Sequence, residues 1–437
     1  MKIELPNHNT FLHVTDNSNE CDASSIFVLT KLNAMYEQSA RDHGCTHIIS
    51  PKECLDLLGI THAIKIIGIT GTNGKTTTAA AIYSILLDLG KKVGLQGTRG
   101  CFINDHRIEE KSLTTPPILQ TIHNLKLAIE AGCEYFVMEV SSHAIVQNRI
   151  DGIAFALKIL TNVTQDHLDF HKTIDEYIAV KSRFFDDESV KLINKDESKI
   201  RFNRTNAMSY GIEHPATYKI LAYSLKECIS AAVAKIDKVY EFESPLHGFF
   251  NLYNLLAAIS AVDMLGVAPM EAICEAVEHF GGVEGRMEVV SHDPLVIVDF
   301  AHTPDGMEKV LDSMKERDLV VVFGAGGDRD RTKRPKMGAM AQRYAKKIVV
   351  TSDNPRSENP QSIITEILAG MNHHESLHVE VDRHEAIEKA LRMQAPNEVL
   401  LILGKGDETY QEIKGKKYPF DDRSVVRELI AQWAKQK

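Results

Sequence analysis

The fold of the chain is decided by the stretch GITGTNGKTTT, residues 68–78. An apolar run, AIKIIGIT (63–70), leads into this stretch, and an amphipathic pattern, TTTAAAIYSILLDLG (76–90), follows it. These patterns predict a strand and then a helix that is closed by Gly90. A glycine-rich turn at the start of a helix exposes backbone amides that bind phosphate. The stretch therefore predicts a phosphate-binding loop between a strand and a helix.

The loop departs from the spacing GxxxxGK[ST], because Ile69 occupies the place of the first glycine. Lys75 can reach the distal phosphates of a nucleotide, and the hydroxyl of Thr76 can ligate magnesium. A glycine-rich turn without a ligand is the alternative, but GKTTT at the start of a long amphipathic helix favours ATP. The residues predicted to bind ATP here are Gly71, Thr72, Asn73, Gly74, Lys75, Thr76 and Thr77.

The same alternation of strand and helix recurs along the chain. Further predicted strands are EYFVMEV (134–140), ALKILTNV (156–163), LVIVDF (295–300), LVVVFG (319–324), KIVVTS (347–352) and VLLILG (399–404). Near-continuous apolar strands separated by helices imply parallel sheets that are covered on both faces. We therefore predict an α/β protein with three domains and a glycine-rich linker at 281–290. They are a small N-terminal α/β domain (1–62), a central P-loop domain with a parallel sheet (63–284), and a C-terminal Rossmann-like domain (285–437).

Composition excludes several classes of function. The chain has 437 residues, 43% of them hydrophobic and 25% charged, which is typical of a soluble globular protein. Its formal net charge of -10 argues against a broad surface for nucleic acid or anionic membrane. The apolar runs are too short to span a bilayer, and the first residues have no signal-peptide core. We expect a cytoplasmic monomer that binds small molecules, with its 7 scattered cysteines reduced.

Polar groups collect where the predicted strands end. In open α/β sheets, ligands bind beyond the carboxyl ends of the strands. The groups found there are Glu139, residues 162–169, Asp299 with His302, Asp328 with Arg329, Arg356, and Glu408. This distribution favours an enzyme whose site lies between two such domains.

The loop and many later motifs resemble the Mur ligases, ATP-dependent amide ligases of peptidoglycan precursor synthesis. The resemblance covers residues 63–437, and in particular it points to the branch that adds the third peptide residue. It implies that ATP phosphorylates a carboxylate to an acyl phosphate, which an amine then attacks. The motifs are MEVSSHAIVQNRIDG, TNVTQDHLDFH, GFFNLYNLLAA, EGRMEVV, VDFAHTPDGMEKVL, GAGGDRDRTKRP, DNPR and GKGDETYQEI.

The resemblance implies a magnesium site and a modified lysine. Taken alone, Glu139 could be a capped strand-end acid, His167 a structural histidine, and Lys181 a solvated helix lysine. The resemblance instead makes these residues, with Thr76, the magnesium ligands. Lys181 would be carbamylated by carbon dioxide to N6-carboxylysine, which turns a cation into a carboxylate. Lys75, Lys181, His167 and Glu139 are accordingly the predicted catalytic residues.

The resemblance also assigns the remainder of ATP and the nucleotide-sugar substrate. Asn251 and Asn254, of which one could be a helix N-cap, would face adenine, and Asp299 would bind the ribose. Arg286 could reach phosphate, and His302 lies just before Thr303-Pro304, a predicted N-cap and first helical residue. Ser18, Thr114, Thr115, Ser141, Gln147 and Arg149 would bind the UDP-muramoyl dipeptide. The N-terminal stretch TDNSNECDASSIFV departs from the family, since Asn19 replaces an arginine.

Within the family that the chain resembles, the segment that corresponds to DNPR, residues 353–356, tracks the amino acid that is added, and this resemblance implies meso-diaminopimelate. This amino acid differs from lysine by a second carboxylate, which a planar guanidinium such as that of Arg356 binds through two parallel hydrogen bonds. The predicted contacts are Arg329, Asp353, Asn354, Pro355, Arg356, Gly404 and Glu408. In GKGDE, Asp407 replaces the histidine that the family commonly has. The alternatives are the same reaction with L-lysine, a folylpolyglutamate-synthase-like ligase, and a nucleotide-binding regulatory module without ligase activity.

Overall fold

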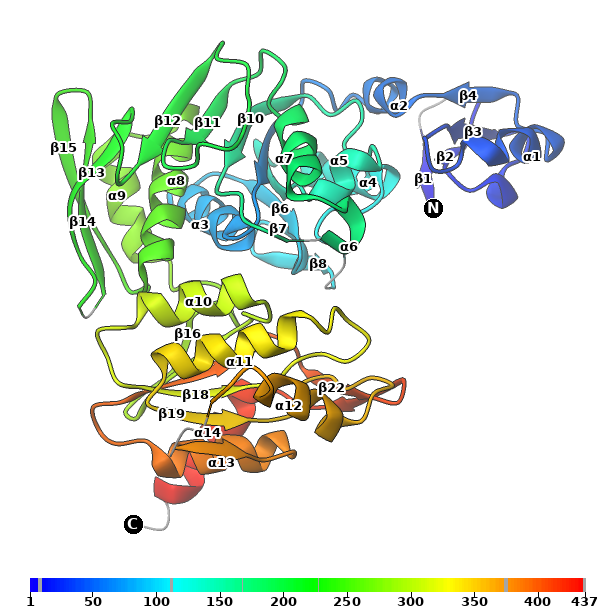
Figure 1. Cartoon of the computed structure of the whole chain (residues 1–437). Helices are drawn as coiled ribbons and strands as arrows, with labels where there is room; N and C mark the ends of the chain where they lie inside the picture. Colours follow the sequence, from blue (N-terminus) through cyan, green and yellow to red (C-terminus); the bar gives the residue numbers. More distant parts are fainter. Residues whose placement is uncertain (7–9, 111–112, 167, 227, 373–375, 435–437) are drawn as a thin grey trace. The chain divides into compact units, whose positions relative to one another are not determined.

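The computed structural model describes residues 1–6, 10–110, 113–166, 168–226, 228–372 and 376–434 (Figure 1). The chain forms two compact units. Unit 1 comprises Met1–Ser224, Ser230–Ser244 and Leu252–Phe280, and unit 2 comprises Leu225–Ile229, Pro245–Asn251 and Gly281–Lys437. Among the described residues, no helix has the length and apolar character needed to cross a membrane.

The N-terminal part of unit 1 is a small sheet with strand order β1-β2-β3-β4. Strand β1 pairs antiparallel with β2, and the other two pairs are parallel. The strands are β1 (Lys2–Glu4), β2 (His13–Thr15), β3 (Ser25–Val28) and β4 (His47–Ile49), and the helices are η1 (Ser18–Glu20), η2 (Ala34–Tyr36), α1 (Glu37–Asp42) and α2 (Pro51–Leu57). Ser50 and Glu53 form a capping box that starts α2. Ile3 and Ile26 of this sheet belong to the same apolar cluster as Ile66 of the central sheet.

The central sheet of unit 1 has the strand order β15-β14-β13-β12-β11-β10-β5-β9-β6-β7-β8. The strands from β13 to β6 in this order pair in parallel, which confirms the parallel sheet that the apolar runs predicted. Its strands are β5 (Lys65–Thr70), β6 (Val93–Gly97), β7 (Gly100–Ile103), β8 (His106–Glu109), β9 (Tyr135–Glu139), β10 (Phe155–Leu160), β11 (Lys191–Asn194), β12 (Ala207–Gly211), β13 (Tyr218–Ser224), β14 (Ile229–Lys235) and β15 (Lys238–Ser244).

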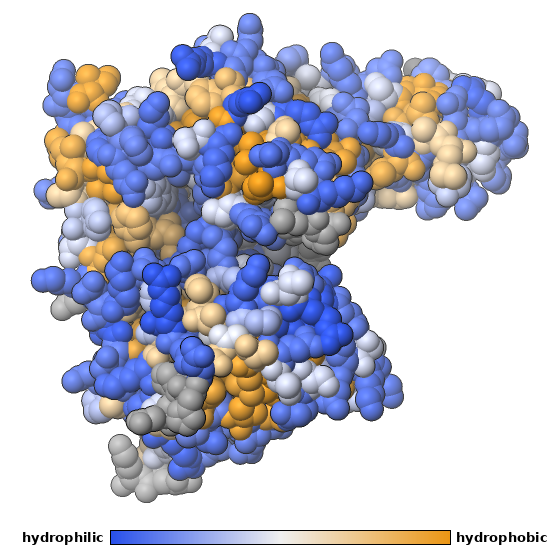
Figure 2. Space-filling model, viewed as in Figure 1, coloured by the Kyte–Doolittle hydropathy of each residue, from blue (hydrophilic) through white to orange (hydrophobic). Residues whose placement is uncertain are grey.

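Both edges of this sheet carry antiparallel strands that the sequence pattern did not predict. Strands β6, β7 and β8 form one antiparallel series, and β14 pairs antiparallel with β13 at the other edge. Apolar side chains gather on the surface at the β14–β15 end (Figure 2). Leu221, Ile236 and Val239 there are 58%, 83% and 55% exposed. This edge of the sheet is therefore partly exposed to solvent. Strands that are exposed on one face do not need the continuous apolar runs of the buried central strands.

The helices of unit 1 confirm one predicted helix end and correct another expectation. They are α3 (Lys75–Asp88), α4 (Ile118–Glu130), α5 (Ser142–Val146), α6 (Leu168–His171), α7 (Ile174–Arg183), α8 (Phe249–Leu265) and α9 (Met270–Glu278). Helix α3 ends just before Gly90, which has the left-handed φ of 72° expected after a helix end. Asn251 and Asn254 both lie inside α8, so neither is its N-cap.

Unit 2 is a doubly wound sheet with strand order β16-β17-β21-β18-β19-β20. Strand β16 is antiparallel to β17, and the other pairs are parallel, as predicted. The strands are β16 (Glu288–His292), β17 (Leu295–Asp299), β18 (Leu319–Phe323), β19 (Lys347–Val350), β20 (Leu377–Val379) and β21 (Val399–Leu403), with a separate hairpin of β22 (Tyr410–Ile413) and β23 (Lys416–Pro419). The predicted linker 281–290 runs into β16, and the predicted domain boundaries at 62/63 and 284/285 stay predictions.

Helices cover both faces of the sheet of unit 2. They are α10 (Pro304–Ser313), α11 (Lys333–Tyr344), α12 (Pro360–Leu368), α13 (Arg383–Met393) and α14 (Asp422–Ala434). Residues of α10, α11 and α12 share one apolar cluster with the sheet, and residues of α13 and α14 share another. Thr303 caps α10 and Pro304 is its first residue, as predicted. The two parallel sheets with helices packed against them confirm the α/β class.

Candidate active site

The predicted phosphate loop lies between β5 and α3. Gly74 has a φ of 82°, and a Cβ built on it would lie 2.2 Å from Oδ1 of Asn254, so both conformation and space require glycine. At Gly71 a Cβ would lie 1.8 Å from Oγ1 of Thr161. The backbone amides of Thr72 and Asn73 donate to the carbonyl and side-chain oxygens of Asn162, at 2.8 and 2.9 Å. The loop is therefore held in shape by the segment that follows β10.

Two lysines converge on this loop. The Nζ atoms of Lys75 and Lys181 both donate to the carbonyl oxygen of Gly71, at 2.9 and 2.8 Å. Lys181 is 1% exposed, and its Nζ also lies 4.9 Å from the centre of the Tyr177 ring. Burial and the neighbouring charge of Lys75 lower the pKa of Lys181 well below its ordinary value, while Asp166 opposes this shift. The burial of Lys181 and its closeness to Lys75 therefore disfavour the charged form of Lys181.

Glu139 ends β9 and connects the loop to the neighbouring strands. It is 2% exposed, and its Oε2 accepts a hydrogen bond from Oγ1 of Thr76 at 3.0 Å. Its Oε1 accepts from the backbone amide of Thr98 at 2.9 Å, and a Cβ on Gly97 would lie 2.2 Å from that oxygen. Carboxylate and hydroxyl oxygens are the ligands that Mg²⁺ prefers, so Glu139 and Thr76 fit the predicted magnesium site. His167 lies outside the described residues.

The predicted residues for the nucleotide sugar form a cluster next to Glu139. Oγ1 of Thr115 donates to the carbonyl oxygen of Glu139 at 2.9 Å and accepts from the backbone amide of Ser141 at 3.0 Å. Ser141 caps α5. The guanidinium of Arg149 donates to the carbonyl of Thr115 at 2.7 Å and to Oε1 of Gln147 at 2.5 Å. These residues therefore meet beside the carboxylate that contacts the phosphate loop.

Arg149 retains donor capacity in this cluster. Its Nε is buried and has no hydrogen-bond partner among the described residues, and burial lowers the pKa of its guanidinium. The hydroxyls of Thr98 and Thr114 lie 3.1 Å apart, which joins Thr114 to the residues around Glu139. An anion could therefore be bound by Arg149 close to the candidate magnesium ligands.

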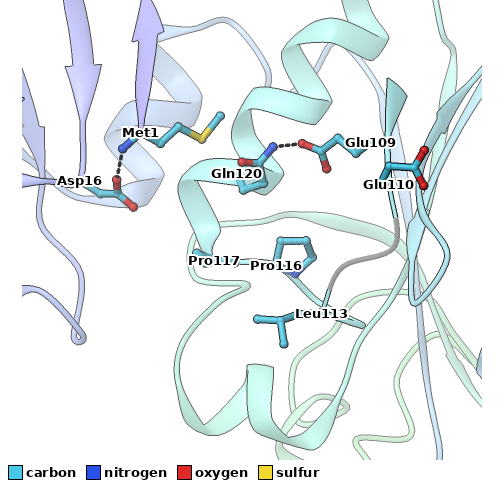
Figure 3. A pocket seen from close by; sticks show the side chains of 8 residues that line it. All are labelled: Met1, Asp16, Glu109, Glu110, Leu113, Pro116, Pro117 and Gln120. Carbon is cyan, nitrogen blue, oxygen red and sulfur yellow. Dashed lines mark hydrogen bonds and ion pairs between the residues drawn. The ribbon is translucent and has the colours of Figure 1, made fainter. Parts of the chain in front are cut away.

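A pocket of about 430 Å³ lies near this cluster in unit 1 (Figure 3). Gln120 donates a hydrogen bond to Glu109 on its wall, and Asp16 closes it from the N-terminal sheet. The lining residues are Met1, Asp16, Glu109, Glu110, Leu113, Pro116, Pro117 and Gln120. Ser18, the predicted uridine contact, is buried in η1 and is not one of them. Pro116 follows Thr115 directly, so the pocket adjoins the predicted nucleotide-sugar residues.

The predicted adenosine contacts divide between the two units. In unit 1, Oδ1 of Asn254 accepts from Oγ1 of Thr78 at 3.4 Å. In unit 2, the Asn251 amide donates to the carbonyl of His247 at 2.9 Å. The carboxylate of Asp299 accepts from the backbone amides of Met287 and Ala301, at 2.8 and 2.7 Å. Asn254 therefore lies against the start of α3, close to the phosphate loop.

The surroundings of Asp299 combine burial with a nearby cation. Burial raises the pKa of Asp299 above its ordinary value. The charge of Arg286 and the two backbone hydrogen bonds that Asp299 accepts oppose this shift. The Arg286 guanidinium lies 4.5 Å from the centre of the Phe300 ring, and Nδ1 of His302 lies 3.0 Å from the carbonyl of Phe300. Asp299 and His302 thus lie at the end of β17, where the strand pattern predicted them, and Arg286 lies beside them against Phe300.

Residues predicted to bind the amino acid meet where β19 and β21 end. The amide of Asn354 donates to Oε2 of Glu408 at 2.8 Å, and Nζ of the fully buried Lys405 donates to the same oxygen at 3.0 Å. Oδ2 of Asp353 is buried without a hydrogen-bond partner among the described residues. A Cβ on Gly404 would lie 2.6 Å from that oxygen. Lys405, which the sequence did not single out, is the cation that balances Glu408.

Arg356 adopts a left-handed backbone conformation, with a φ of 49°. Its Nη1 donates to the carbonyl of Gly327 at 2.6 Å, and its Nε lies 3.4 Å from Oε2 of Glu412. Arg329 is exposed on the adjoining loop, and Pro355 packs its carbonyl against Gly327. Arg356 therefore lies on the same loop as Asp353 and keeps part of its side chain accessible, while Arg329 lies on the loop after β18, the strand between β19 and β21.

This fold and this arrangement of sites belong to a known class. The chain matches the Mur ligase middle domain over residues 69–262 and the Mur ligase glutamate ligase domain over residues 285–406. It therefore belongs to the Mur ligase family, as the sequence motifs implied, and the folds of its structural relatives are consistent with three domains.

Within that class, the chain is similar to enzymes named UDP-N-acetylmuramoyl-L-alanyl-D-glutamate–2,6-diaminopimelate ligase. The enzyme of Wolinella succinogenes is 56% identical over 419 residues, which are 96% of this chain and 96% of the relative. That of Helicobacter pylori is 49% identical over 432 residues, again 96% of each. A solved structure with the same name has a TM-score of 0.72 at 29% identity, and the match covers 99% of this chain and 98% of the other.

Proposed function

We propose that the chain is an ATP-dependent ligase that adds meso-diaminopimelate to UDP-N-acetylmuramoyl-L-alanyl-D-glutamate. The reaction forms an amide with the γ-carboxylate of the D-glutamate, in cytoplasmic peptidoglycan precursor synthesis, and the enzyme acts as a monomer. One observation carries the proposal. Glu139 contacts Thr76 of the phosphate loop on one side and is joined through Thr115 to Ser141 and Arg149 on the other. A nucleotide phosphate and an acceptor carboxylate would therefore be held side by side.

The protein groups act mainly by positioning and by balancing charge. The amino-terminal end of α3 and Lys75 bind the phosphates of ATP, while Arg149 holds the muramoyl dipeptide. Thr76, Glu139, His167 and Lys181 would hold Mg²⁺, which neutralises charge that develops on the transferred phosphoryl group. Transfer to the γ-carboxylate gives an acyl phosphate, and the diaminopimelate amine displaces phosphate from it. Asn251, Asn254, Arg286, Asp299 and His302 are assigned to the nucleoside part of ATP, as the family resemblance implies.

We assign a carbamate to Lys181. Lys181 is fully buried, and burial and the charge of Lys75 lower its pKa, which favours the neutral amine, the form that reacts with carbon dioxide. The product is an N-carboxylate, which together with Glu139 and Thr76 would supply oxygen ligands for Mg²⁺. The Gly71 carbonyl, on which both lysines now converge, would then be left to Lys75.

The amino-acid site is assigned to the ends of β18, β19 and β21 in unit 2. Arg356 and Arg329 would bind a carboxylate, and Asp353 with Glu408 would bind an ammonium group. This set of charges suits a zwitterion with an additional carboxylate, which is the property that separates diaminopimelate from lysine. Asn354, Pro355 and Gly404 shape the two loops.

The nucleotide end of the sugar substrate is assigned to the pocket that Asp16, Glu109 and Gln120 line. It adjoins Thr115 on one side, and on the other it reaches Asp16 at the end of β2, two residues before Ser18 of η1. Replacement of an arginine by Asn19 implies that uridine is held differently here than the family motif suggests.

The decisive experiment measures phosphate release from ATP with Mg²⁺ and UDP-muramoyl dipeptide. Diaminopimelate, L-lysine and L-glutamate are supplied in turn as the amine. We expect stimulation by diaminopimelate well above that by the other two. No stimulation by diaminopimelate would refute the function, and comparable use of lysine would refute the specificity.

A further inference from the structure

Three loops carry residues assigned to the amino acid. The loop with Arg329 follows β18, and the other two follow strands that are not neighbours. Asp353–Arg356 follow β19, and Gly404–Glu408 follow β21, but β18 lies between these strands in the sheet. Backbone hydrogen bonds of the sheet therefore link each strand to β18 and not to the other. The side chain of Asn354 contacts Lys405 and Glu408 directly within the loops, and a further contact links the ends of the two strands behind them.

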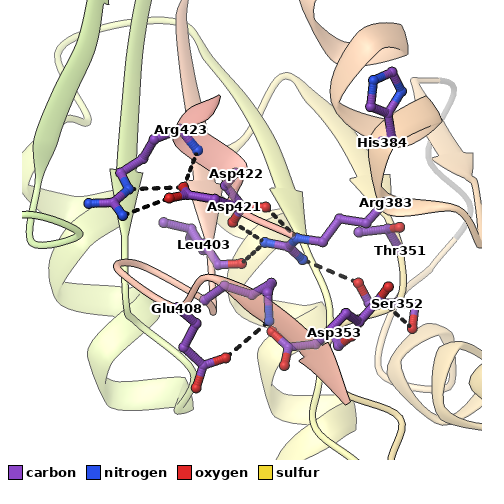
Figure 4. A network of polar contacts seen from close by, with 12 residues as sticks. Thr351, Ser352, Asp353, Arg383, His384, Leu403, Glu408, Asp421, Asp422 and Arg423 are labelled. Carbon is purple, nitrogen blue, oxygen red and sulfur yellow. Dashed lines mark hydrogen bonds and ion pairs between the residues drawn. The ribbon is translucent and has the colours of Figure 1, made fainter. Parts of the chain in front are cut away.

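That contact is made by Arg383, the first residue of α13. Its side chain is fully buried, Nη1 donates to the carbonyl of Ser352 at 3.3 Å, and Nη2 donates to the carbonyl of Leu403 at 3.0 Å (Figure 4). Ser352 directly precedes Asp353, and Leu403 directly precedes Gly404. One guanidinium thus bridges the ends of β19 and β21 across β18.

The bridge is itself fixed by a second buried charge. Nε and Nη2 of Arg383 donate to the two carboxylate oxygens of Asp422, the first residue of α14, at 2.7 and 2.8 Å. Both side chains are 0% exposed, and this parallel two-bond geometry is one that lysine cannot reproduce. Two glycines allow these loops to approach each other closely. A Cβ on Gly324, after β18, would lie 2.4 Å from the carbonyl oxygen of Thr351, and a Cβ on Gly404 would lie 2.6 Å from Oδ2 of Asp353. The rigid bridge and the glycines together leave little freedom in the spacing.

We propose that Arg383, oriented by Asp422, is a positioning residue that sets the distance between the two amino-acid-binding loops. It acts without touching the substrate, and this role rests on the function proposed above. A substrate with charged groups at both ends requires a fixed separation between the groups that bind them, and a displacement of about 1 Å can cost about 100-fold in rate. Loss of the bridge would therefore affect the amino acid far more than ATP.

The test uses the full chain and the double variant Arg383→Met with Asp422→Leu. Removing both charges together leaves no unpaired charge in the core. A buried ion pair can often be replaced in this way by apolar residues of similar volume without loss of stability. We expect KM for diaminopimelate to rise about tenfold or more, with KM for ATP and for UDP-muramoyl dipeptide within about twofold of the parent values. Hydrogen exchange of the amides in residues 353–356 and 404–408 should become faster in the same variant.

The matched control is Arg423→Met. Arg423 follows Asp422 in α14 and pairs with Asp421 and Glu288, but makes no bond to the strand ends among the described contacts. It should leave KM for diaminopimelate and the exchange of both loops unchanged. Unchanged exchange in the double variant, or an equal rise of KM for ATP, would overturn the positioning role. If the parent chain shows no diaminopimelate-dependent phosphate release, the proposed function fails, and loop exchange still decides whether Arg383 sets the spacing.

Discussion

The phosphate loop of unit 1 and the paired loops of unit 2 are built from different interactions. The phosphate loop is one continuous stretch, held by neutral hydrogen bonds that the backbone amides of residues 72 and 73 donate to Asn162. The paired loops come from separate strands and are held by buried charges, among them Arg383 with Asp422 and Lys405 with Glu408. Phosphate is bound largely by backbone amides, which one short motif can supply. Side-chain charges of opposite sign must instead be brought together by the fold.

The electrostatics of the two regions follow the same division. Unit 1 places two amines on the carbonyl of Gly71, an arrangement suited to a polyanion and to a lysine that changes its charge. Unit 2 combines an acid oxygen of Asp353, unpartnered among the described residues, with the guanidinium of Arg356, which suits a zwitterion. Variants that exchange or remove these charges should therefore affect one substrate and spare the other.

The largest effect is expected for Lys181→Ala in unit 1. Loss of a metal-binding carbamate should lower kcat by about 1000-fold, because stabilisation of charge in phosphoryl transfer would be lost. Short carboxylates such as formate or acetate should restore part of the activity by occupying the space of the carbamate. The measurement is the rate of phosphate release with saturating substrates, with and without added carboxylate. Full activity of the variant without them would exclude the carbamate.

A smaller and more selective effect is expected for Arg356→Lys in unit 2. KM for diaminopimelate should rise by about 10- to 100-fold, because an ammonium group cannot form two parallel hydrogen bonds to a carboxylate. KM for ATP should change little. Arg331→Lys, on the surface of the same unit and paired with Glu366, is the control and should be close to the parent. Equal losses for ATP and diaminopimelate would mean that Arg356 is structural.

Gly74→Ala tests whether backbone shape alone governs the phosphate loop. Both Gly74 and Gly90 have left-handed conformations, which cost an alanine about 1 kcal/mol. No described atom lies within 4 Å of a Cβ built at Gly90, whereas at Gly74 it would strike Asn254. Gly74→Ala should therefore raise KM for ATP about tenfold, and Gly90→Ala should lower stability without changing that KM. A KM for ATP that rises in both variants would assign the effect to lost stability.

The sequence predicted local features in both regions better than long-range ones. The loop 71–77, the parallel strands and the Thr303-Pro304 helix start depend on neighbouring residues, and they were found. The antiparallel extension was missed because β13, β14 and β15 mix apolar residues with lysines and glutamates and are partly exposed. Asn251 and Asn254 have the spacing of a helix start but lie inside α8.

The contacts that organise the sites were harder to predict because they join residues that are far apart in the sequence. Arg383 and Asp422 are 39 residues apart, and each alone resembles an ordinary charge at the start of a helix. Asn162 was visible as a polar residue at a strand end, but its role depends on a loop 89 residues earlier. Only the strand order, which places β18 between β19 and β21, reveals what Arg383 connects.

The smallest effect concerns the pH dependence of unit 2. Hydrogen bonds from the buried Arg334 and the amide of Asp328 lower the pKa of Glu358 to about 2. A folded-state pKa below the unfolded value of about 4.5 means that Glu358 stabilises the folded protein fully above pH 4.5. This contribution is lost as the pH falls from about 4.5 toward 2. Glu358→Gln should lower the free energy of unfolding by about 1 kcal/mol at pH 7, after allowance for partial exposure.

The chain allows this prediction to be measured on unit 2 alone, because its single tryptophan, Trp433, lies in α14. Urea unfolding followed by Trp433 fluorescence from pH 7 to pH 3 should show a difference between parent and Glu358→Gln that shrinks as the pH falls. Glu308→Gln is the control, because Glu308 pairs with Arg343 on the surface at 44% exposure. Its difference from the parent should be below about 0.5 kcal/mol. A difference for Glu358→Gln that stays constant with pH would mean that packing, and not the charge, stabilises this loop.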